Sequence, residues 1–340
     1  MTSSQTMRAL YVEQAGGEFV SRAVPVPTAG PGQVLVRIEA SGVNPLDTKV
    51  RAGKAEHARQ PLPAILGMDL AGTVVAVGEG VTQFRPGDEV YGMAGGIGGL
   101  QGTLAEMAAV DARLIAKKPS NLSMREAAAL PLAIITAWEG LVDRANVSAG
   151  QSVLVHGGTG GVGHIAVQLA VARGARVAAT VSAEQFDLAK SFGATPIDYR
   201  SSTLEDYVGR LTDGEGFDVV YDTVGGATLD ASFKAARTYG GHVLSILGWG
   251  THSLAPLSFR AATYSGVFTL MPMITGKGRE HHGEILREAA GLIEAGKIRP
   301  LVDPATFTLD NAIEAHRLVE SGKARGKVVV DVTAAQGFPS

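Results

Sequence analysis

The chain has 340 residues and a formal charge of −3, and hydrophobic residues make up 45% of it against 19% charged residues. These values indicate about two globular domains with large cores, exclude a disordered chain, and give no reason to expect a nucleic acid or a membrane surface as partner. The absence of cysteine excludes disulfides, thiolate metal sites and a cysteine nucleophile. The N-terminus has no apolar run suited to a signal peptide or a membrane span, so we expect a cytoplasmic protein.

Short runs rich in Val and Ile fill the first third of the chain. ALYVE, QVLVRIEA, AGTVVAVG and DEVYGM are separated by turns rich in Pro and Gly. Such runs predict strands. We expect an all-β unit, a partly closed barrel, over residues 1–127.

The pattern changes near Ser123. Glu126 follows Ser123 at the spacing of a capping box, which predicts the start of a helix. Beyond it, helices are predicted over 161–173 and 183–192, and strands at SVLVHG, RVAATV, PIDY, FDVVYDTVG, GGHVLSILG and GVFTLMP. Apolar strands that alternate with helices predict a doubly wound parallel sheet, which we place at 128–271.

The last part of the chain carries two helical segments from about Gly283 and a final strand, GKVVVDV. A lone strand needs a partner, so we expect it to return to the N-terminal β unit. That unit is then discontinuous, over 1–127 and 272–340. The predicted fold class is therefore α/β, with a discontinuous, partly closed β-barrel and a doubly wound parallel domain.

The run HGGTGGVGH directly follows the predicted strand 152–155. Its glycines match G-x-G-x-x-G at 158, 160 and 163, a spacing that lets a pyrophosphate approach the backbone at the start of a helix. An ordinary glycine-rich loop is the alternative, but the strand before and the helix after favour a dinucleotide site. The residues expected to hold the cofactor here are Gly157, Thr159, Gly160, Gly161 and Val162.

The end of the next predicted strand, ATVSAEQ, indicates which dinucleotide binds. NAD sites usually place a carboxylate there for the ribose 2′-hydroxyl. Here Thr180 and Ser182 occupy the position and no acid precedes Glu184. We therefore favour NADPH over NADH. Ser182 could equally cap the next helix, and both roles are compatible.

Five motifs together resemble the medium-chain dehydrogenase/reductase superfamily, and within it the zinc-free quinone oxidoreductases related to zeta-crystallin. They are SGVNPLDTKVRAG, LGMDLAGTVVAVGEGVTQFRPGDEVYG, AAALPLAIITAWEGL, GGTGGVGHIAVQLA and FDVVYDTVGG, and the resemblance spans about residues 7 to 332. It implies a GroES-like barrel domain, a Rossmann domain, and hydride transfer from NADPH to a quinone or an α,β-unsaturated carbonyl.

The resemblance also bears on metal binding. Zinc-using members carry Cys at the position of Asn44, His at Met68 and a further ligand near Leu132, and none of these ligands is present here. A catalytic zinc needs three protein ligands, so we expect no zinc. The adjacent pair His281-His282 is another source of ligands, but neighbours on a helix point in different directions.

For the reacting end of the site, the resemblance implies Asn44 at the nicotinamide, with a simple Asn-Pro turn as the alternative. Lys49 is a candidate proton donor, although a solvated surface lysine is the plainer interpretation. Asp47 either contacts the substrate or holds Arg51 or a local turn. Since the stretch DTKVRAGKAEHARQ holds no tyrosine, the resemblance to enoyl thioester reductases is weaker.

Further residues follow from the resemblance. Those expected at the cofactor are Thr136, Tyr199, Leu247, Phe268 and Leu270, and those expected at the substrate are Asp47, Met68 and Trp249. Tyr199 would lie beside the 2′-phosphate, where a basic residue of some relatives corresponds to Phe186. Asp69 is expected to anchor the barrel wall through backbone groups or a basic side chain.

Two other functions stay open from the sequence. One is a zinc-type alcohol dehydrogenase, and the other is a non-catalytic NADPH-binding structural or sensor protein. For the assembly, the apolar segment GVFTLMPM near the end of the doubly wound sheet favours a homodimer.

Overall fold

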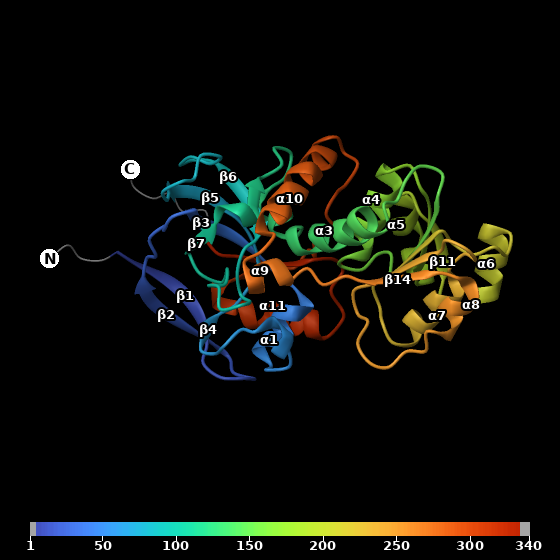
Figure 1. Cartoon of the computed structure of the whole chain (residues 1–340). Coiled ribbons are helices and arrows are strands. Elements are labelled where there is room, and N and C mark those ends of the chain that lie inside the picture. The colour runs from blue at the N-terminus through green and yellow to red at the C-terminus, as the bar shows by residue number, and fades with distance from the viewer. Residues whose placement is uncertain (1–4, 334–340) are drawn as a thin grey trace. The chain divides into compact units, whose positions relative to one another are not determined.

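The computed structural model describes residues 5–333 and divides the chain into two compact units (Figure 1). Unit 1 comprises residues 1–132, 270–294 and 300–340, and unit 2 comprises residues 133–269 and 295–299. The predicted boundaries lay at 127/128 and 271/272. The ends of the predicted barrel domain, residues 1–4 and 334–340, lie outside the described residues.

Unit 1 is built on a seven-stranded sheet in the order β15-β16-β3-β5-β6-β8, with β7 also paired to β3. Side chains of β3 alternate between buried and half-buried, as expected for a strand with one face on the core. The strands are β3 Gln33–Val43, β5 Asp69–Val77, β6 Glu89–Met93, β7 Met107–Asp111, β8 Ile115–Lys117, β15 Phe307–Thr308 and β16 Val328–Asp331. A smaller sheet has the order β2-β1-β4, from Phe19–Pro25, Thr6–Val12 and Ala64–Ile65.

The final strand returns to the N-terminal sheet as predicted. β16 pairs antiparallel with β3, and Val328 lies opposite Val43. Valines on both strands are buried in the core of unit 1. Residues near 327 and near 44 are therefore neighbours although almost the whole chain separates them.

Helices cover unit 1 on several sides. They are α1 Pro45–Arg51, α2 Met124–Ala128, α9 Met271–Thr275, α10 Arg279–Glu294 and α11 Ala312–Glu320, with 3-10 turns at Glu56–Ala58, Ala112–Leu114 and Leu309–Asn311. The predicted capping box is present, because the Ser123 hydroxyl accepts from the Glu126 N–H at 3.3 Å and Glu126 accepts from the Ser123 N–H at 2.9 Å. Helix α3, Pro131–Trp138, begins in unit 1, and a π-helical turn over Glu139–Arg144 follows it in unit 2.

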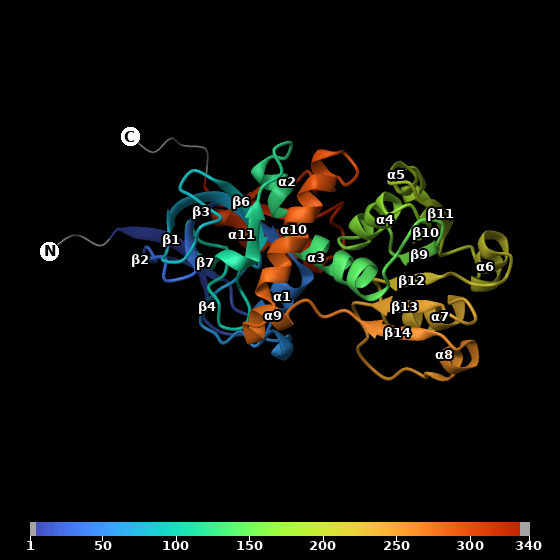
Figure 2. The ribbon, with the colours of Figure 1, turned by 45° about the horizontal axis from the view of Figure 1, so that its top comes forward.

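Unit 2 is a six-stranded parallel sheet in the order β11-β10-β9-β12-β13-β14, which follow one another down the view in Figure 2. Its strands are β9 Ser152–His156, β10 Arg176–Val181, β11 Thr195–Asp198, β12 Val219–Asp222, β13 His242–Ser245 and β14 Thr263–Gly266. Its helices are α4 Gly163–Ala172, α5 Phe186–Ser191, α6 Leu204–Thr212, α7 Ala227–Ala235 and α8 Ala255–Arg260. The strand order reverses between β9 and β12, the place where doubly wound sheets bind their ligands.

Two predicted elements are wrong in detail. The run GVFTLMP is not a strand: β14 ends at Gly266, and α9 begins at Met271 with Pro272 in its first turn, a position that favours a helix start. The predicted helix over 183–192 is a 3-10 turn, Ala183–Gln185, followed by the short α5. No helix within residues 5–333 is long and apolar enough to cross a membrane.

Candidate active site

The glycine loop of unit 2 is tied to the neighbouring strand by its backbone. Gly157 has φ +71°, and its N–H donates to the Thr180 hydroxyl at 3.2 Å. The Gly158 N–H donates to the Thr180 carbonyl at 3.1 Å, and the Gly160 N–H to the Gly157 carbonyl at 2.9 Å. Within the loop, the Thr159 hydroxyl also donates to the Gln185 side-chain oxygen at 2.8 Å, so the turn between β9 and α4 is fixed by backbone and side-chain bonds together.

Close packing explains why glycine is needed in this loop. A Cβ on Gly158 would lie 2.4 Å from the Ala179 Cβ, and one on Gly163 would lie 2.0 Å from the Gly157 carbonyl oxygen. Helix α4 starts at Gly163, and the preceding residue, Val162, caps it with no side-chain hydrogen bond. The N–H groups of His164 and Ile165 donate to the Gly160 and Val162 carbonyls at 3.0 and 3.1 Å, and with no side chain capping the helix its positive dipole end faces the loop, which suits a pyrophosphate. The loop fits a dinucleotide.

The carboxyl ends of β12 and β13 are held by Asp222. This buried carboxylate accepts from the Gly225 N–H at 2.9 Å and from the Ser245 hydroxyl at 2.8 Å. Nearby, Thr223 donates to the His156 carbonyl at 2.6 Å. Burial lowers the pKa of His156 to about 4, so this ring is neutral near pH 7. Asp222 and Thr223 are engaged in hydrogen bonds within the protein, and His156 carries no charge near pH 7. The glycine loop is therefore the part of this sheet edge that suits an anion.

Residues expected at the adenosine end gather after β10 and β11. Tyr199 is 57% exposed, and the guanidinium carbon of Arg200 lies 5.5 Å from its ring centre. Arg200 also lies 3.4 Å from Glu184. Ser182 occupies the cap position of the following 3-10 turn but makes no capping hydrogen bond. A basic group is thus present beside Tyr199, although Phe186 occupies the position where some relatives carry a basic residue; the missed signal was the arginine directly after Tyr199.

In unit 1, Asn44 lies at the centre of a buried cluster that we call the Lys327 cluster: Asn44, Asp47, Asp69 and Lys327. The Asn44 side-chain N–H donates to Asp69 at 2.9 Å, and its main-chain N–H donates to Asp47 at 2.8 Å. The Lys327 ammonium donates to the Asn44 side-chain oxygen. The other oxygen of Asp69 accepts from the Leu132 N–H at 3.0 Å, in the first turn of α3.

Burial dominates the electrostatics of the Lys327 cluster. Asn44 and Asp69 are 0% exposed, Asp47 2% and Lys327 5%. Burial raises the pKa of Asp47 to about 7, helped by the neighbouring charge of Asp69, while Lys327 opposes the rise. Burial raises the pKa of Asp69 to about 6, again against Lys327, and lowers the pKa of Lys327. The charge of Lys327 thus acts on two carboxyl groups, those of Asp47 and Asp69. Since one positive charge cannot balance two buried negative charges, one of the two carboxyl groups binds a proton near neutral pH.

The sequence anticipated part of this cluster. Asp69 is anchored by a backbone N–H, as expected, and by the Asn44 amide, whereas the basic group Lys327 acts on it through its charge. Asp47 holds the local turn at the start of α1, whereas its alternative partner, Arg51, bonds to Glu320 at 2.8 Å. Lys327 was missed, because only the pairing of β16 with β3 brings it to Asn44. The available signal was a lysine directly ahead of the apolar run VVVDV.

The other residues expected in unit 1 lie apart from the hydrogen bonds of this cluster. Lys49 is exposed on α1. Met68 is fully buried just before β5, and its carbonyl accepts from the Ala94 N–H at 2.7 Å. Leu270 is buried at the start of α9.

Unit 2 carries the remaining expected residues. Thr136 is buried on α3, and its carbonyl accepts from the Tyr221 hydroxyl at 2.6 Å. Trp249 is 55% exposed and packs edge-on against Phe268, with ring centres 6.3 Å apart. Leu247 is half-buried after β13.

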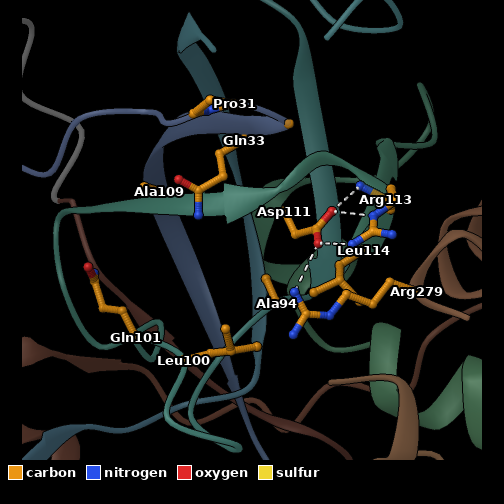
Figure 3. Close-up of a pocket in the computed structure, with 11 residues that line it drawn as sticks. Pro31, Gln33, Ala94, Leu100, Gln101, Ala109, Asp111, Arg113, Leu114 and Arg279 are labelled. Carbon is orange, nitrogen blue, oxygen red and sulfur yellow. Dashed lines mark hydrogen bonds and ion pairs between the residues drawn. The ribbon is translucent and has the colours of Figure 1, made fainter. Parts of the chain in front are cut away.

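A cavity of about 270 Å³ in unit 1 lies among other residues (Figure 3). Its charged groups are mutually satisfied, because Asp111 binds Arg113 at 2.8 Å and Arg279 at 2.9 Å. None of the residues expected at the cofactor or the substrate lines it. We therefore do not place the chemistry there.

Comparison with known proteins supports the same organisation. Residues 30–120 match the family model described as alcohol dehydrogenase GroES-like domain, and residues 192–330 match that described as zinc-binding dehydrogenase. The chain is 41% identical to 2-methylene-furan-3-one reductase of Solanum lycopersicum, over 90% of this chain and 74% of that protein. It is 37% identical to the chloroplastic NADPH-dependent alkenal/one oxidoreductase of Arabidopsis thaliana, over 95% and 79%. The chain belongs to the medium-chain dehydrogenase/reductase superfamily.

A solved structure agrees with this assignment. The crystal structure of an alcohol dehydrogenase superfamily protein from Novosphingobium aromaticivorans is 58% identical and superposes with a TM-score of 0.94, covering 96% of this chain and all of that one. The predicted fold class, a GroES-like barrel with a Rossmann domain, is confirmed. The chain is an oxidoreductase of the medium-chain dehydrogenase/reductase superfamily.

The residues do not suit the catalytic zinc that some superfamily members use. Within residues 5–333, no group of three or more His, Cys, Asp or Glu side chains gathers as a metal site. The Asn44 oxygen is bonded to an ammonium, and Met68 offers a thioether. His281 lies 3.3 Å from Glu284 and is half exposed, whereas His282 is fully buried, so the two rings face different surroundings.

Proposed function

We propose that the protein is an NADPH-dependent reductase of α,β-unsaturated carbonyl compounds or quinones. The observation that carries the proposal is the glycine loop of unit 2, whose backbone suits a pyrophosphate at the start of α4. The names of the two plant relatives favour the unsaturated carbonyl as the acceptor. Such acceptors are already electrophilic, so orientation and hydrogen bonding supply much of the catalysis.

In this proposal the cofactor is held by unit 2. The loop residues Gly157–Val162 and the start of α4 bind its pyrophosphate, and Ser182, Tyr199 and Arg200 receive the 2′-phosphate. An arginine supplies a charge-assisted contact to a phosphate that a ribose hydroxyl cannot match. When bound, NADPH supplies the hydride that reduces the acceptor.

Unit 1 acts on the acceptor. Formation of a carbon–hydrogen bond at the β-carbon shifts the π electrons of the double bond onto the carbonyl oxygen. Asn44 donates a hydrogen bond to this developing oxyanion. Lys49 then gives a proton to the α-carbon and is reprotonated by water, so that the acceptor gains one hydride and one proton in total.

The role of Lys49 is tested by Lys49→Met. Loss of a general acid lowers kcat by about 100-fold, with NADPH affinity unchanged. Lys54→Met, another exposed lysine of unit 1, is the matched control and keeps wild-type kcat. A wild-type rate in Lys49→Met would mean that water supplies the proton directly.

We further propose that the reaction needs no zinc, because a lysine ammonium and a thioether stand among the groups where a metal would need ligands. Elemental analysis is expected to find less than one zinc per ten chains, and activity to survive dialysis against EDTA. One zinc per chain, lost together with activity, would overturn this proposal.

The assembly is proposed to be a homodimer in the cytoplasm. Strand β14 forms one edge of the sheet of unit 2 and pairs only with β13 among the described strands. Such an edge offers unpaired N–H and carbonyl groups to a second copy. Light scattering at micromolar concentration should give twice the chain mass, and a monomer would contradict the proposal.

A steady-state assay tests the function itself. Purified protein is mixed with NADPH or NADH and a panel of 2-alkenals, cyclic enones and quinones, or with NADP+ or NAD+ and saturated alcohols, and the reduced or oxidised product is identified by mass spectrometry. We expect turnover with the unsaturated carbonyls and NADPH. If NADPH binds but none of the panel is reduced, the protein is a cofactor-binding protein and not this reductase.

A further inference from the structure

Lys327 is buried at a place where a lysine is costly. Only 5% of its surface is exposed, and burying an ammonium is unfavourable unless it is paired and hydrogen-bonded. Its main chain is held on both sides, since its N–H donates to the Leu301 carbonyl at 2.7 Å and its carbonyl accepts from Asp303 at 2.9 Å. With the main chain fixed in this way, the Lys327 ammonium donates a hydrogen bond to the side-chain oxygen of Asn44.

The sheet register explains this convergence. β16 starts at Val328, opposite Val43, which places Lys327 beside Asn44. On the other side of β3, Gly42 lies opposite Asp69. A Cβ on Gly42 would come within 3.1 Å of the Asp69 Cβ and 2.2 Å of the Ala128 carbonyl oxygen, so glycine is needed for the approach. The pairing of β16, β3 and β5 thus places the Lys327 ammonium at the oxygen of the Asn44 amide and the Asp69 carboxylate at its nitrogen.

The charges decide which way the Asn44 amide faces. Its oxygen meets the Lys327 ammonium and its nitrogen meets the Asp69 carboxylate. The flipped amide would point oxygen at carboxylate and N–H at ammonium, and would lose both bonds. The amide oxygen is thereby turned toward the ammonium, while the amide nitrogen keeps a second hydrogen besides the one it donates to Asp69, so the N–H is the group that Asn44 can offer to a ligand.

We infer that Lys327 is a positioning residue that holds Asn44 as a hydrogen-bond donor and thereby selects a carbonyl or oxyanion ligand over an alcohol hydroxyl. The inference rests on the proposed function. A carbonyl oxygen accepts from the amide throughout the reaction, more strongly as negative charge develops on it. An alcohol would have to bind without donating its own proton to Asn44, which disfavours alcohol oxidation.

The role of Lys327 also has a dependence on pH. The charged groups of the cluster are Asp47 on α1, Asp69 at the start of β5 and Lys327 ahead of β16. Without the ammonium, the buried Asp69 carboxyl binds a proton more readily. A protonated Asp69 donates its own hydrogen to the Asn44 oxygen, which turns the amide around.

A double-mutant cycle tests the inference. We expect Lys327→Met to lower kcat/KM for an enone by about 100-fold, the loss typical of one oxyanion donor, with less than about 3-fold change in NADPH affinity measured by fluorescence. In an Asn44→Ala background the same change should have less than about 3-fold effect, since Lys327 acts through Asn44. Additive losses would overturn the inference while leaving the proposed function intact.

Two further variants separate positioning from folding. Lys118→Met removes another buried lysine of unit 1, which bonds to Glu89, and should change the melting temperature but not kcat/KM. If Lys327→Met does not fold, Lys327→Gln, which keeps a neutral hydrogen-bond donor, replaces it in the double-mutant cycle with Asn44→Ala. The loss in either Lys327 variant should deepen from pH 8 to pH 6 relative to wild type, and a loss that does not vary with pH would indicate a structural role alone.

A readout without turnover completes the test. The chain has four asparagines, Asn44, Asn121, Asn146 and Asn311, so selective ¹⁵N labelling gives few side-chain amide signals. The signal absent from Asn44→Ala identifies Asn44, and Lys327→Met should shift it in the cofactor-free protein. An unmoved signal contradicts the inference, whereas failure of wild-type protein to reduce any enone contradicts only the proposed function.

Discussion

The two units build their binding groups in different ways. Unit 2 uses backbone: the loop from Gly157 to Gly163 presents N–H groups at the start of α4, and side chains serve mainly to brace it. Unit 1 uses side chains, and the Lys327 cluster draws Asn44, Asp47, Asp69 and Lys327 from separate parts of the chain. In the glycine loop, an added side-chain atom is expected to displace the backbone and so weaken binding. In the Lys327 cluster, a change of pH or the loss of one charge is expected to alter the hydrogen bonds.

The largest effect is expected from adding one methyl group to the backbone site. In Gly163→Ala the new Cβ would lie 2.0 Å from the Gly157 carbonyl oxygen, so the loop must move. We expect NADPH to bind at least about 100-fold more weakly, or nearly 3 kcal/mol, by fluorescence titration. Gly209→Ala on α6, where an added Cβ meets no atom within 4 Å, is the control and should bind normally. Normal binding by Gly163→Ala would remove the contrast between the units.

Next in size is a pH effect specific to unit 1. The folded pKa of Asp47 is raised from 3.8 to about 7, so the folded state binds a proton more tightly than the unfolded state. The contribution of Asp47 to stability is therefore fully present below about pH 4 and is lost as pH rises to about 7, by at most about 1.4 kcal/mol per pH unit. Urea unfolding at several pH values should show this slope in wild type and a smaller one in Asp47→Asn. Equal slopes would mean that Asp47 does not hold the proton.

A smaller effect, on cofactor preference, is expected from removing the Arg200 side chain of unit 2. Arg200→Ala removes the exposed guanidinium beside Tyr199 and should lower the preference for NADPH over NADH by about 10-fold, the value of one exposed charge-assisted contact. Arg210→Ala, an exposed arginine on α6, is the matched control. The measurement is kcat/KM with each cofactor, and an unchanged ratio would place the 2′-phosphate elsewhere.

The smallest effect is expected at Trp249. This ring is half exposed and is braced by Phe268, so Trp249→Ala should raise KM for a bulky enone by about 3-fold, as expected for loss of part of one apolar contact, and leave kcat unchanged. Phe259→Ala, a more exposed aromatic of unit 2, should change neither constant. A drop in kcat would assign Trp249 a larger part in orienting the acceptor.

The sequence predicts the site in unit 2 better than the one in unit 1, because the first is formed by residues close together in the chain and the second by residues far apart. The glycine loop is local, so its spacing together with the strand before it and the helix after it indicated the site, and the alternation of strands and helices indicated a doubly wound parallel sheet, although not the order of its strands. Asp69 was expected to be held by backbone groups or by a basic group, but Lys327 could not be named, since only the register of β16 on β3 brings Lys327 into this cluster. Arg200 was passed over because its guanidinium reaches the site from the turn after β11, where the sequence shows only a charged residue beside Tyr199.

The return of the last strand has a consequence for how the protein is made. Unit 2 comprises residues 133–269 and 295–299, so all of its residues are translated before Val328–Asp331. The sheet of unit 1 is incomplete until Val328–Asp331 pairs with β3, and Lys327, whose charge acts on both Asp47 and Asp69, is translated directly before that strand. A chain that stalls before Lys327 therefore holds every residue of unit 2 but lacks the strand that pairs with β3 in the sheet of unit 1.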